Sequence, residues 1–343
     1  MESSGAPRVT PPASRPFRVR WLVVAVVVCA AVPAVFLFTR PQRCALSEVT
    51  IEISPHPITV AFYHALHQGY FAAEGLQVQL TNHVTGRLAL AALSEKGSDF
   101  ATCAETPFVH AYSQGAPLTV LASIGQIGKS VCIIGRRDRG MTSHPISLAG
   151  RRLGVPRGTS VEYDVYSTCL LYGVPLDQLT IVDTAPESLQ ATLAEGSVDA
   201  VAMWEPFASR ARAALGEEVL EVEIGDFARS MWLLVARSKP RDPQREQALL
   251  RALIRATADL VHEPERYLGP VAEATGFTLT ELRRDVKQIR YRVSLSQPLL
   301  LSLEAQRRWL KLAGPEVFDG LSPQALLAVD PTAVDLVHPE VIP

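Results

Sequence analysis

The alternation of apolar and polar positions predicts strands and helices that follow one another along most of the chain. Residues 49–54 alternate with the period of two that is typical of a strand, and Thr59 then begins a segment with apolar residues at helical spacing. We expect further strands at 76–80, 99–103, 118–124, 131–135, 148–156, 179–183, 198–204 and 230–236, and helices at 85–96, 158–172, 186–195 and 206–214. Because strands that alternate with helices form parallel sheets, the pattern predicts an α/β protein built on parallel sheets.

One segment design appears twice, about a hundred residues apart. Glu follows Asp by six positions in both Asp99-Phe-Ala-Thr-Cys-Ala-Glu105 and Asp199-Ala-Val-Ala-Met-Trp-Glu205, and a Pro-Phe pair comes soon after each Glu. Pro is favoured in the first turn of a helix, so each Glu marks the point where a strand ends and a helix begins. Ligands of open α/β sheets bind at this edge. Two such units predict two similar lobes that face each other.

We place the lobes by the same pattern. Lobe I is expected at 49–138 and 235–343, and lobe II at 139–234, with the chain crossing near 136–142 and 230–237. From Pro243 onward the periodicity is helical, and these helices are expected to cover lobe I at 244–263, 279–290 and 302–313.

The N-terminal region has the pattern of a membrane segment. Residues 21–38 carry no charge, and as a helix they would span roughly 27 Å, which is close to the thickness of the hydrocarbon core. Arginines are more frequent before this segment than after it, which favours the N-terminus inside. We predict a disordered cytoplasmic tail at 1–20, a transmembrane anchor at 21–38, a linker at 39–48 and a membrane-anchored extracytoplasmic or periplasmic remainder. A cleavable signal peptide is the alternative, although no small-x-small site closes the apolar run.

Composition and charge narrow the classes of function. The 33 Lys and Arg are scattered and the net charge is −2, so a nucleic-acid partner is not expected. The five Cys show no metal-binding spacing, and an odd number excludes complete internal pairing, so we interpret them as buried thiols. The chain has neither G-x-S-x-G nor H-E-x-x-H. We therefore expect no metal, no cofactor and no enzyme activity.

Two loops are candidates for anion binding. Gly158-Thr159-Ser160 begins a helix and offers free N–H groups and hydroxyls, although a plain N-cap explains the same residues. Thr85-Gly86-Arg87 has the same two interpretations, with Arg87 either solvated or clamping an anion.

Other candidate site residues at strand ends also have two interpretations each. Glu105 and Glu205 either accept hydrogen bonds from a ligand or cap their own helices. Trp204 either lines the cleft or packs inside its lobe. His56 lies between two prolines, a position that favours a rigid turn over a ligand contact.

At these residues the chain resembles the substrate-binding proteins of ABC importers in the nitrate, sulfonate, taurine and thiamine-precursor group. The resemblance covers roughly 49–260 and is carried by the segments Ala65-Leu-His-Gln-Gly-Tyr-Phe-Ala-Ala-Glu-Gly-Leu76, Gly97-Ser-Asp-Phe100, Leu148-Ala-Gly-Arg-Arg-Leu-Gly-Val-Pro156, Gly196-Ser-Val-Asp-Ala200 and Trp204-Glu-Pro206. It implies a type II periplasmic-binding-protein fold, in which two lobes joined by a two-strand hinge close on a small solute. The implied partners are an ABC permease and its ATPase. Many relatives are soluble after cleavage or are lipoproteins, so the predicted anchor departs from the group.

The resemblance also implies the residues of the ligand site. Carried over by position, they are Ser54, His56, Thr59, Thr85, Gly86, Arg87, Glu105, Thr106, Gly158, Thr159, Ser160, Trp204 and Glu205. Helix starts favour an anionic group and the two Glu favour amine or hydroxyl donors, so a zwitterion such as an aminosulfonate fits, as does a neutral heterocycle. One alternative is an enzyme on the same fold in thiamine-precursor or menaquinone-type metabolism, although the Cys-rich motif of the thiamine-pyrimidine enzymes is lacking. Another is a tethered sensor.

Overall fold

The computed structural model describes residues 46–128, 131–225, 229–313 and 329–332. These residues fall within one compact unit that begins at Leu46. The expected tail at 1–20, the anchor at 21–38 and residues 39–45 of the linker lie outside the described residues, whereas Ser47 and Glu48, expected in the linker, begin the strand Ser47–Ile53. Among the helices that are described, none is both long enough and apolar enough to cross a bilayer.

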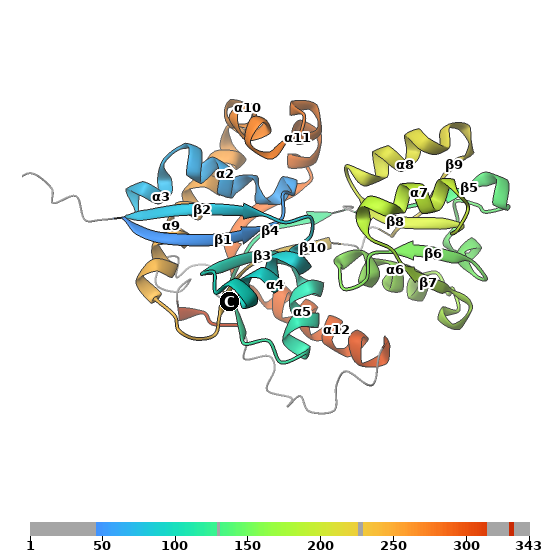
Figure 1. The fold of residues 1–343 in the computed structure, drawn as a ribbon, viewed down its shortest axis with the longest axis horizontal. Coiled ribbons are helices and arrows are strands. Elements are labelled where there is room, and N and C mark those ends of the chain that lie inside the picture. Colours follow the sequence, from blue (N-terminus) through green and yellow to red (C-terminus); the bar gives the residue numbers. More distant parts are fainter. Residues whose placement is uncertain (1–45, 129–130, 226–228, 314–328, 333–343) are drawn as a thin grey trace, which may run out of the picture. The chain divides into compact units, whose positions relative to one another are not determined.

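The first sheet of the described residues has six strands and defines lobe I (Figure 1). In spatial order they are β11 (Ile289–Ser294), β4 (Leu118–Gly128), β10 (Arg229–Arg237), β3 (Phe100–Ala104), β1 (Ser47–Ile53) and β2 (Leu76–Asn82). β1 pairs in parallel with β2 and β3, whereas β10 runs antiparallel to β3 and β4, and β11 antiparallel to β4. The expectation of purely parallel sheets is therefore wrong. β10 returns from the other lobe and enters this sheet in the opposite direction, which the hydrophobic pattern of a strand does not show.

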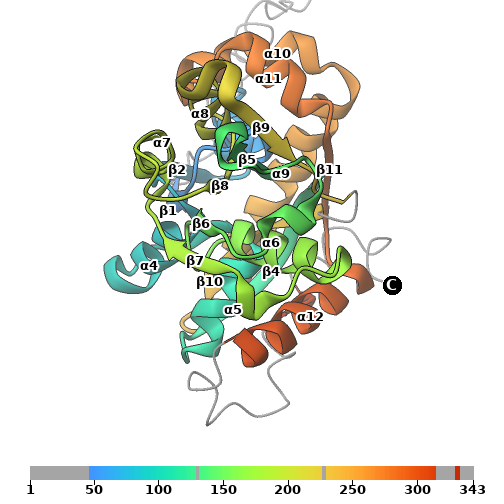
Figure 2. The same cartoon turned by 90° about the vertical axis from the view of Figure 1, so that its right-hand side faces the viewer.

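Helices cover the lobe I sheet on both sides (Figure 2). On one side α2 (Val60–His67), α3 (Tyr70–Ala73), α9 (Pro243–His262) and α10 (Pro264–Thr275) pack together, and on the other lie α4 (Gly86–Lys96), α5 (Glu105–Ser113) and α12 (Gln297–Ala313). The short α11 (Leu279–Val286) packs against α10. Fully buried side chains such as Ile51, Phe62 and Leu121 form the core between these layers.

Lobe II contains a five-stranded sheet in the order β7 (Thr180–Asp183), β6 (Arg152–Val155), β8 (Ala200–Trp204), β5 (Val131–Arg136) and β9 (Val219–Val222). Successive side chains of β5 point to opposite faces, as the pleat of a strand requires. Ile133 packs in the cluster that includes α6 (Ser160–Leu171), and Ile134 in the cluster formed with α7 (Leu189–Ala194) and α8 (Phe207–Leu215). The second sheet is therefore also buried between helices.

The repeated Asp residues perform the same task in each lobe. A carboxylate oxygen of Asp99 accepts a hydrogen bond from the Thr50 N–H at 2.8 Å, and one of Asp199 accepts from the Arg152 N–H at 2.9 Å. Each bond ties the residue ahead of one strand to the neighbouring parallel strand, β3 to β1 and β8 to β6. The two units found in the sequence are therefore equivalent parts of two similar lobes.

The places where the chain crosses between the sheets differ from the expectation. The strand at 131–136, expected in lobe I, belongs to the lobe II sheet, and 229–234, expected in lobe II, belongs to lobe I. The chain thus leaves lobe I between Gly128 and Val131 and returns between Val222 and Arg229. Both strands are apolar along their length, so the hydrophobic pattern identifies them without revealing which sheet they join.

The C-terminal region follows the expectation in part. The helix predicted at 244–263 is α9, and 302–313 is the larger part of α12, whereas α10 was not predicted. The segment 279–290 is α11 followed by the start of β11. In β11 the side chains of Ile289, Tyr291 and Val293 are buried, and Arg290 and Arg292 are exposed. This alternation was present in the sequence and should have indicated a strand.

The start of α4 lies unusually close to the lobe I sheet. A Cβ on Gly86 would be 2.8 Å from the Cβ of Cys103 and 2.9 Å from its Cα, which is closer than side chains tolerate. Thr85 caps this helix, because its Oγ1 accepts a hydrogen bond from the Leu88 N–H at 3.2 Å. Only glycine lets the first turn of α4 approach β3 in this way.

We expect Gly86→Ala to lower the free energy of unfolding by about 1–3 kcal/mol, because the added methyl group overlaps backbone and side chain of a buried strand. Chemical denaturation measures the change. Gly128→Ala is the matched control, since a Cβ there meets no described heavy atom within 4 Å. Equal stability of Gly86→Ala and wild type would contradict the close approach.

Candidate functional site

A cavity lies between the lobes at the strand ends, with about 500 Å³ of empty space when the adjoining open solvent is included. We call it the central cavity. Both lobes contribute to its wall, and seven of the residues predicted for the ligand site are among those that line it. The lining residues are Ser54, His56, Thr85, Gly86, Ala104, Pro107, Val131, Thr159, Ser160, Trp204, Ser230 and Trp232.

Three helices begin at the wall of the central cavity. Gly86 and Ser160 are the first residues of α4 and α6, and Pro107 lies in the first turn of α5. The first N–H groups of a helix have no partner within the helix, and its N-terminus carries a partial positive charge. Among the residues that the structure describes, the lining includes no Asp, Glu, Lys or Arg. The cavity therefore favours a negative group through neutral donors.

An indole and an imidazole form one side of the cavity. The rings of His56 and Trp232 stack with centroids 4.6 Å apart and planes 18° apart. Burial lowers the pKa of His56 to about 4, so the ring is neutral at pH 7. The Nε1–H of Trp232 is buried and has no hydrogen-bond partner among the described residues. An unpaired buried donor costs about 1–3 kcal/mol, which a ligand oxygen would relieve.

His56 also shapes its own loop. Its Nδ1 accepts a hydrogen bond from the Ile58 N–H at 3.3 Å, and its main-chain N–H donates to Thr59 Oγ1 at 3.1 Å. The turn that the flanking prolines suggested is therefore present, and the same side chain lines the cavity.

Hydroxyl groups provide further donors. Thr85 Oγ1 accepts from Leu88, which leaves its own O–H free to donate. Ser160 and Ser230 hydroxyls have no hydrogen-bond partner among the residues that the structure describes. Thr159, in contrast, donates its O–H to the Pro156 carbonyl at 2.7 Å and does not cap α6 with its side chain.

Several predicted site residues lie outside the wall of the central cavity. Thr59 is fully buried and donates its hydroxyl to the carbonyls of Ser54 and His56. Thr106 donates to Gln306 Oε1 at 2.7 Å on α12. Gly158 has a positive φ of 71° and lies against the Arg87 side chain, whose Cδ would be 2.9 Å from a Cβ there. These contacts support the loops of the site.

Glu105 is directed into lobe I and does not line the cavity. Its carboxylate accepts hydrogen bonds from the Met231 N–H at 2.8 Å and from Ser302 Oγ at 2.7 Å. Burial raises the pKa of Glu105 to about 7 despite these hydrogen bonds, which lower it. The residue thus joins α5, β10 and α12.

Direct contacts between α12 and α6 join the lobes. Trp309 on α12 lies against Tyr163 and Tyr166 of α6, with ring centroids 5.2 Å and 5.8 Å apart. Asp164, in the same turn of α6, is buried and its carboxyl group has no hydrogen-bond partner among the described residues. Burial, together with the charge of Glu105, raises the pKa of Asp164 to about 8.

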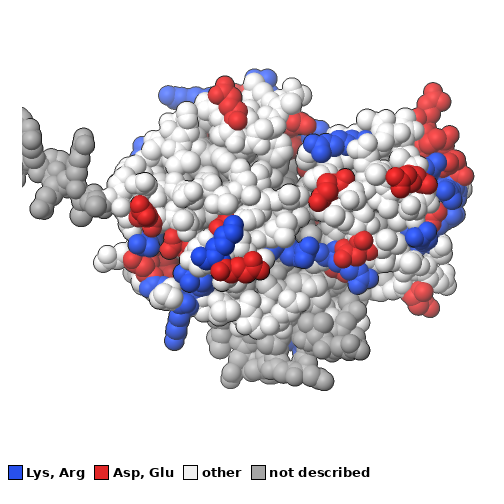
Figure 3. Space-filling view, viewed as in Figure 1, with Lys and Arg blue, Asp and Glu red and all other residues white. Residues whose placement is uncertain are grey.

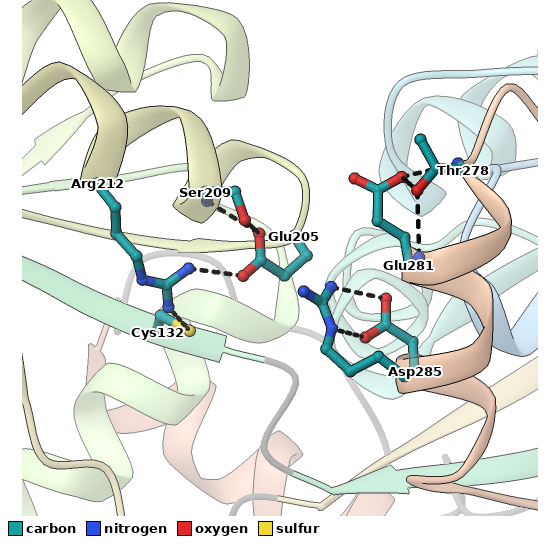
Figure 4. A network of polar contacts seen from close by, with 8 residues as sticks. Cys132, Glu205, Ser209, Arg212, Thr278, Glu281 and Asp285 are labelled. Atoms are coloured by element: carbon teal, nitrogen blue, oxygen red, sulfur yellow. Dashed lines mark hydrogen bonds and ion pairs between the residues drawn. The ribbon is translucent and has the colours of Figure 1, made fainter.

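Glu205 interacts within lobe II (Figure 4). One carboxylate oxygen accepts from the N–H and hydroxyl of Ser209, at 2.9 Å and 2.7 Å, and the other accepts from Arg212 Nη1 at 2.7 Å. Burial raises the pKa of Glu205, but these hydrogen bonds outweigh it, so the pKa lies below its ordinary value. Of the two roles open from the sequence, this geometry is that of a helix cap.

Glu205 also borders a second space between the lobes, of about 850 Å³ and partly open to solvent. We call it the side recess. It is lined by His56, Pro57, Ile127, Cys132, Glu205, Arg212, Arg284, Asp285 and Gln288. Unlike the central cavity, it contains charged side chains of both signs.

The molecular surface offers little charge segregation. On the face seen in Figure 3, Lys and Arg are interspersed with Asp and Glu. This matches the scattered charges of the sequence.

The sequence of the central region decides the family. Residues 57–267, more than half of the chain, match the family described as NMT1/THI5 like. The chain belongs to the NMT1/THI5-like family.

The chain is also similar, at low sequence identity, to curated proteins. The taurine-binding periplasmic protein of Escherichia coli (strain K12) is 23% identical over 203 residues, which cover 58% of this chain and 62% of that protein. The putative aliphatic sulfonates-binding protein of Bacillus subtilis (strain 168) is 24% identical over 178 residues, 51% of this chain and 53% of that protein. The chain therefore matches less than two thirds of the length of each.

Solved structures share the fold. The alkanesulfonate-binding protein SsuA from Xanthomonas axonopodis pv. citri, bound to MOPS, superposes with a TM-score of 0.68 at 16% identity. The match covers 83% of this chain and 98% of that one. The two-lobed α/β fold expected from the sequence is thus confirmed for the described part of this NMT1/THI5-like protein.

Sequence reasoning missed Ser230 and Trp232, which come from β10. The hydrophobic pattern predicts this segment only as an apolar strand that returns the chain. Ser230 and Trp232 are two positions apart and therefore project from the same face of the strand. A Ser and a Trp at the start of an otherwise apolar strand were the available signal.

We expect Asp164→Asn to change how stability depends on pH. The folded protein keeps a proton on Asp164 up to about pH 8, whereas the ordinary pKa is 3.8, so folding binds a proton between these values. The stabilising effect of this proton is complete below about pH 4 and is lost as the pH rises to about 8. Asn cannot ionise, so the melting temperature of the variant should increase relative to that of wild type as the pH rises.

Melting curves from pH 4 to pH 8 test this expectation. Asp177→Asn, at an exposed position of lobe II, is the control and should follow wild type throughout. Parallel curves for Asp164→Asn and wild type would show that Asp164 does not hold the proton.

Proposed function

We propose that this protein is the extracytoplasmic solute-binding component of an ABC importer and that it captures small organic sulfonates in the central cavity. The observation that carries the proposal is the lining itself, in which three helix N-termini and neutral hydrogen-bond donors surround the space and no described lining residue is charged. Two similar proteins are named as binding proteins for taurine and for aliphatic sulfonates, and this supports the same ligand class.

A sulfonate suits this wall chemically. It remains ionised across the physiological pH range, it accepts hydrogen bonds at three oxygens, and it has no proton to donate. The wall offers several hydrogen-bond donors for these three oxygens. They are the N–H groups at the helix starts Gly86 and Ser160, the hydroxyls of Thr85 and Ser230, and the indole N–H of Trp232. Helix N-termini bind anions in this way without a formal positive charge.

The rest of the cavity suits the organic part of such a ligand. Trp204, Trp232, Val131 and Ala104 provide apolar surface beside the donors. Nitrate has no organic part and would leave this surface uncovered, so an organosulfonate is the better match within the ligand group implied by the resemblance. Ligand pockets commonly combine an apolar wall with a few placed polar groups.

The lining gives little support to an enzyme. Among the described residues that line the central cavity there is no carboxylate, thiol or amine side chain, and the low pKa of His56 makes it a poor base at neutral pH. Capture is the function that these groups serve. By the same proposal, the lobes close about the two chain crossings and present the solute to a permease that is driven by an ATPase.

We expect Trp232→Phe to weaken sulfonate binding by about tenfold or more, because the indole N–H is lost while an aromatic ring remains to stack on His56. Calorimetric titration with taurine and ethanesulfonate measures the affinity, with nitrate and a thiamine pyrimidine as comparison ligands.

Trp309→Phe is the matched control for this titration. Its Nε1 is also buried without a partner among the described residues, but Trp309 does not line the cavity. Because Phe keeps an aromatic ring against Tyr163 and Tyr166 and only the N–H is lost, the sulfonate affinity of Trp309→Phe should stay within about twofold of wild type. Unchanged affinity of Trp232→Phe, or binding of the comparison ligands in place of sulfonates, would reject the proposal.

We further propose that the protein is tethered to the cell membrane by residues 21–38. The support is the length and lack of charge of this segment, together with the flanking arginines. We expect protein isolated from native membranes to keep its N-terminal residues. Mass spectrometry that finds a mature N-terminus between Ala30 and Ser47 would instead indicate a cleaved signal peptide.

A further inference from the structure

The side recess adjoins the central cavity, and the proposed function does not use it. His56 lines both spaces. The strand ends that border them also continue from one to the other, since Val131 and Trp204 line the cavity, and the next residues, Cys132 and Glu205, line the recess. A ligand whose head lies in the cavity therefore has space for a distal part beyond His56.

The charged side chains of the recess are already paired within their own lobes. On lobe II, Arg212 binds Glu205 and Glu221 and donates to Cys132 Sγ at 3.3 Å. On lobe I, Arg284 donates from Nε and Nη2 to the two carboxylate oxygens of Asp285, at 2.6 Å and 3.1 Å. Figure 4 shows Glu205 and Asp285 on opposite sides, each held by a partner from its own side.

This pairing leaves donors available in the recess. Arg284 Nη1 and the side-chain amide of Gln288 have no hydrogen-bond partner among the described residues, and both residues line the recess. The side chain of Arg284 is 46% exposed. The charges of the described lining residues sum to zero, with Arg212 and Arg284 against Glu205 and Asp285. A charged group would therefore gain no net attraction, whereas a neutral oxygen can accept from Arg284.

We infer that the side recess is a subsite for the distal end of the ligand, and that this end carries a neutral acceptor, such as a hydroxyl or ether oxygen, which binds Arg284. The inference rests on the proposed function, because the sulfonate head must occupy the central cavity. It adds a preference for sulfonates with an oxygen-bearing tail over plain alkanesulfonates of the same length.

A different role for the same residues is a direct bond between Glu205 and Arg284 when the lobes close. Glu205 contributes, after the hydrogen bonds to Asp285, to raising the pKa of Arg284. However, the Glu205 carboxylate already accepts two hydrogen bonds from Ser209 and one from Arg212, which leaves about one of its roughly four acceptor sites for a closing bond. A ligand oxygen, in contrast, needs only the free Nη1 of Arg284.

The test is a calorimetric titration with linear alkanesulfonates from ethane to octane, each with and without a terminal hydroxyl. Wild type should prefer the hydroxylated member of the longer pairs by roughly tenfold, the effect of one hydrogen bond to a charged donor. Arg284→Ala should remove this preference and leave the affinity for ethanesulfonate unchanged. Arg283→Ala is the matched control, because Arg283 lies next to Arg284 on α11, binds Glu265 and does not line the recess. It should keep the preference.

The outcomes separate the two proposals. If ethanesulfonate binds wild type but no pair shows a preference, or if Arg284→Ala keeps the preference, the subsite is refuted and the proposed function stands. If Arg284→Ala weakens ethanesulfonate as much as the long hydroxylated ligands, Arg284 acts in lobe closure and the subsite is likewise refuted. If no sulfonate binds wild type, the proposed function fails and the subsite with it.

Discussion

The backbone N–H groups at the start of a helix have no partner within that helix, and this constraint explains the centre of the molecule. α4, α5 and α6 begin at the same cavity, and the first N–H groups of each helix need hydrogen-bond acceptors that the helix itself does not provide. The parallel strand order brings these starts together, because β1, β2, β3 and β6 all end on the side that faces the other lobe. An anion between the lobes would therefore be bound by both of them. A charged side chain in the wall would compete with that anion or neutralise it, and no described residue of the lining is charged.

The repeated Asp-to-Glu unit shows how much the sequence could predict. Its Asp residues make equivalent bonds in both lobes, so the repeat correctly indicated two similar lobes. Its Glu residues diverge, since Glu105 joins α5 to β10 and α12, while Glu205 caps α8 and borders the side recess. A strand-to-helix junction predicts where the backbone of a Glu lies, but the hydrogen-bond partners of its carboxylate come from residues far along the chain. Ser302 and Met231 could not have been identified from the local pattern of Glu105.

The same distinction applies to the fold. Periodicity located β2, α4 and α9 closely, because each buries one face with a regular repeat, and β3, which is buried on both faces, was located as a short apolar run. It did not assign β5 and β10 to the correct sheets, since pairing depends on contacts across the molecule. In the site, the loops at Ser54, Thr85 and Ser160 could be predicted because they follow strands in order. Trp232 enters from a returning antiparallel strand, for which chain order gives no guide.

A crystal structure with a bound alkanesulfonate, in which the sulfur is located by its anomalous signal, tests the central claim most directly. The account predicts one sulfur position in the central cavity, with sulfonate oxygens within hydrogen-bond distance of the α6 start at Ser160 and of Trp232 Nε1. A sulfur elsewhere, or oxygens held by arginine side chains in place of helix starts, would contradict it.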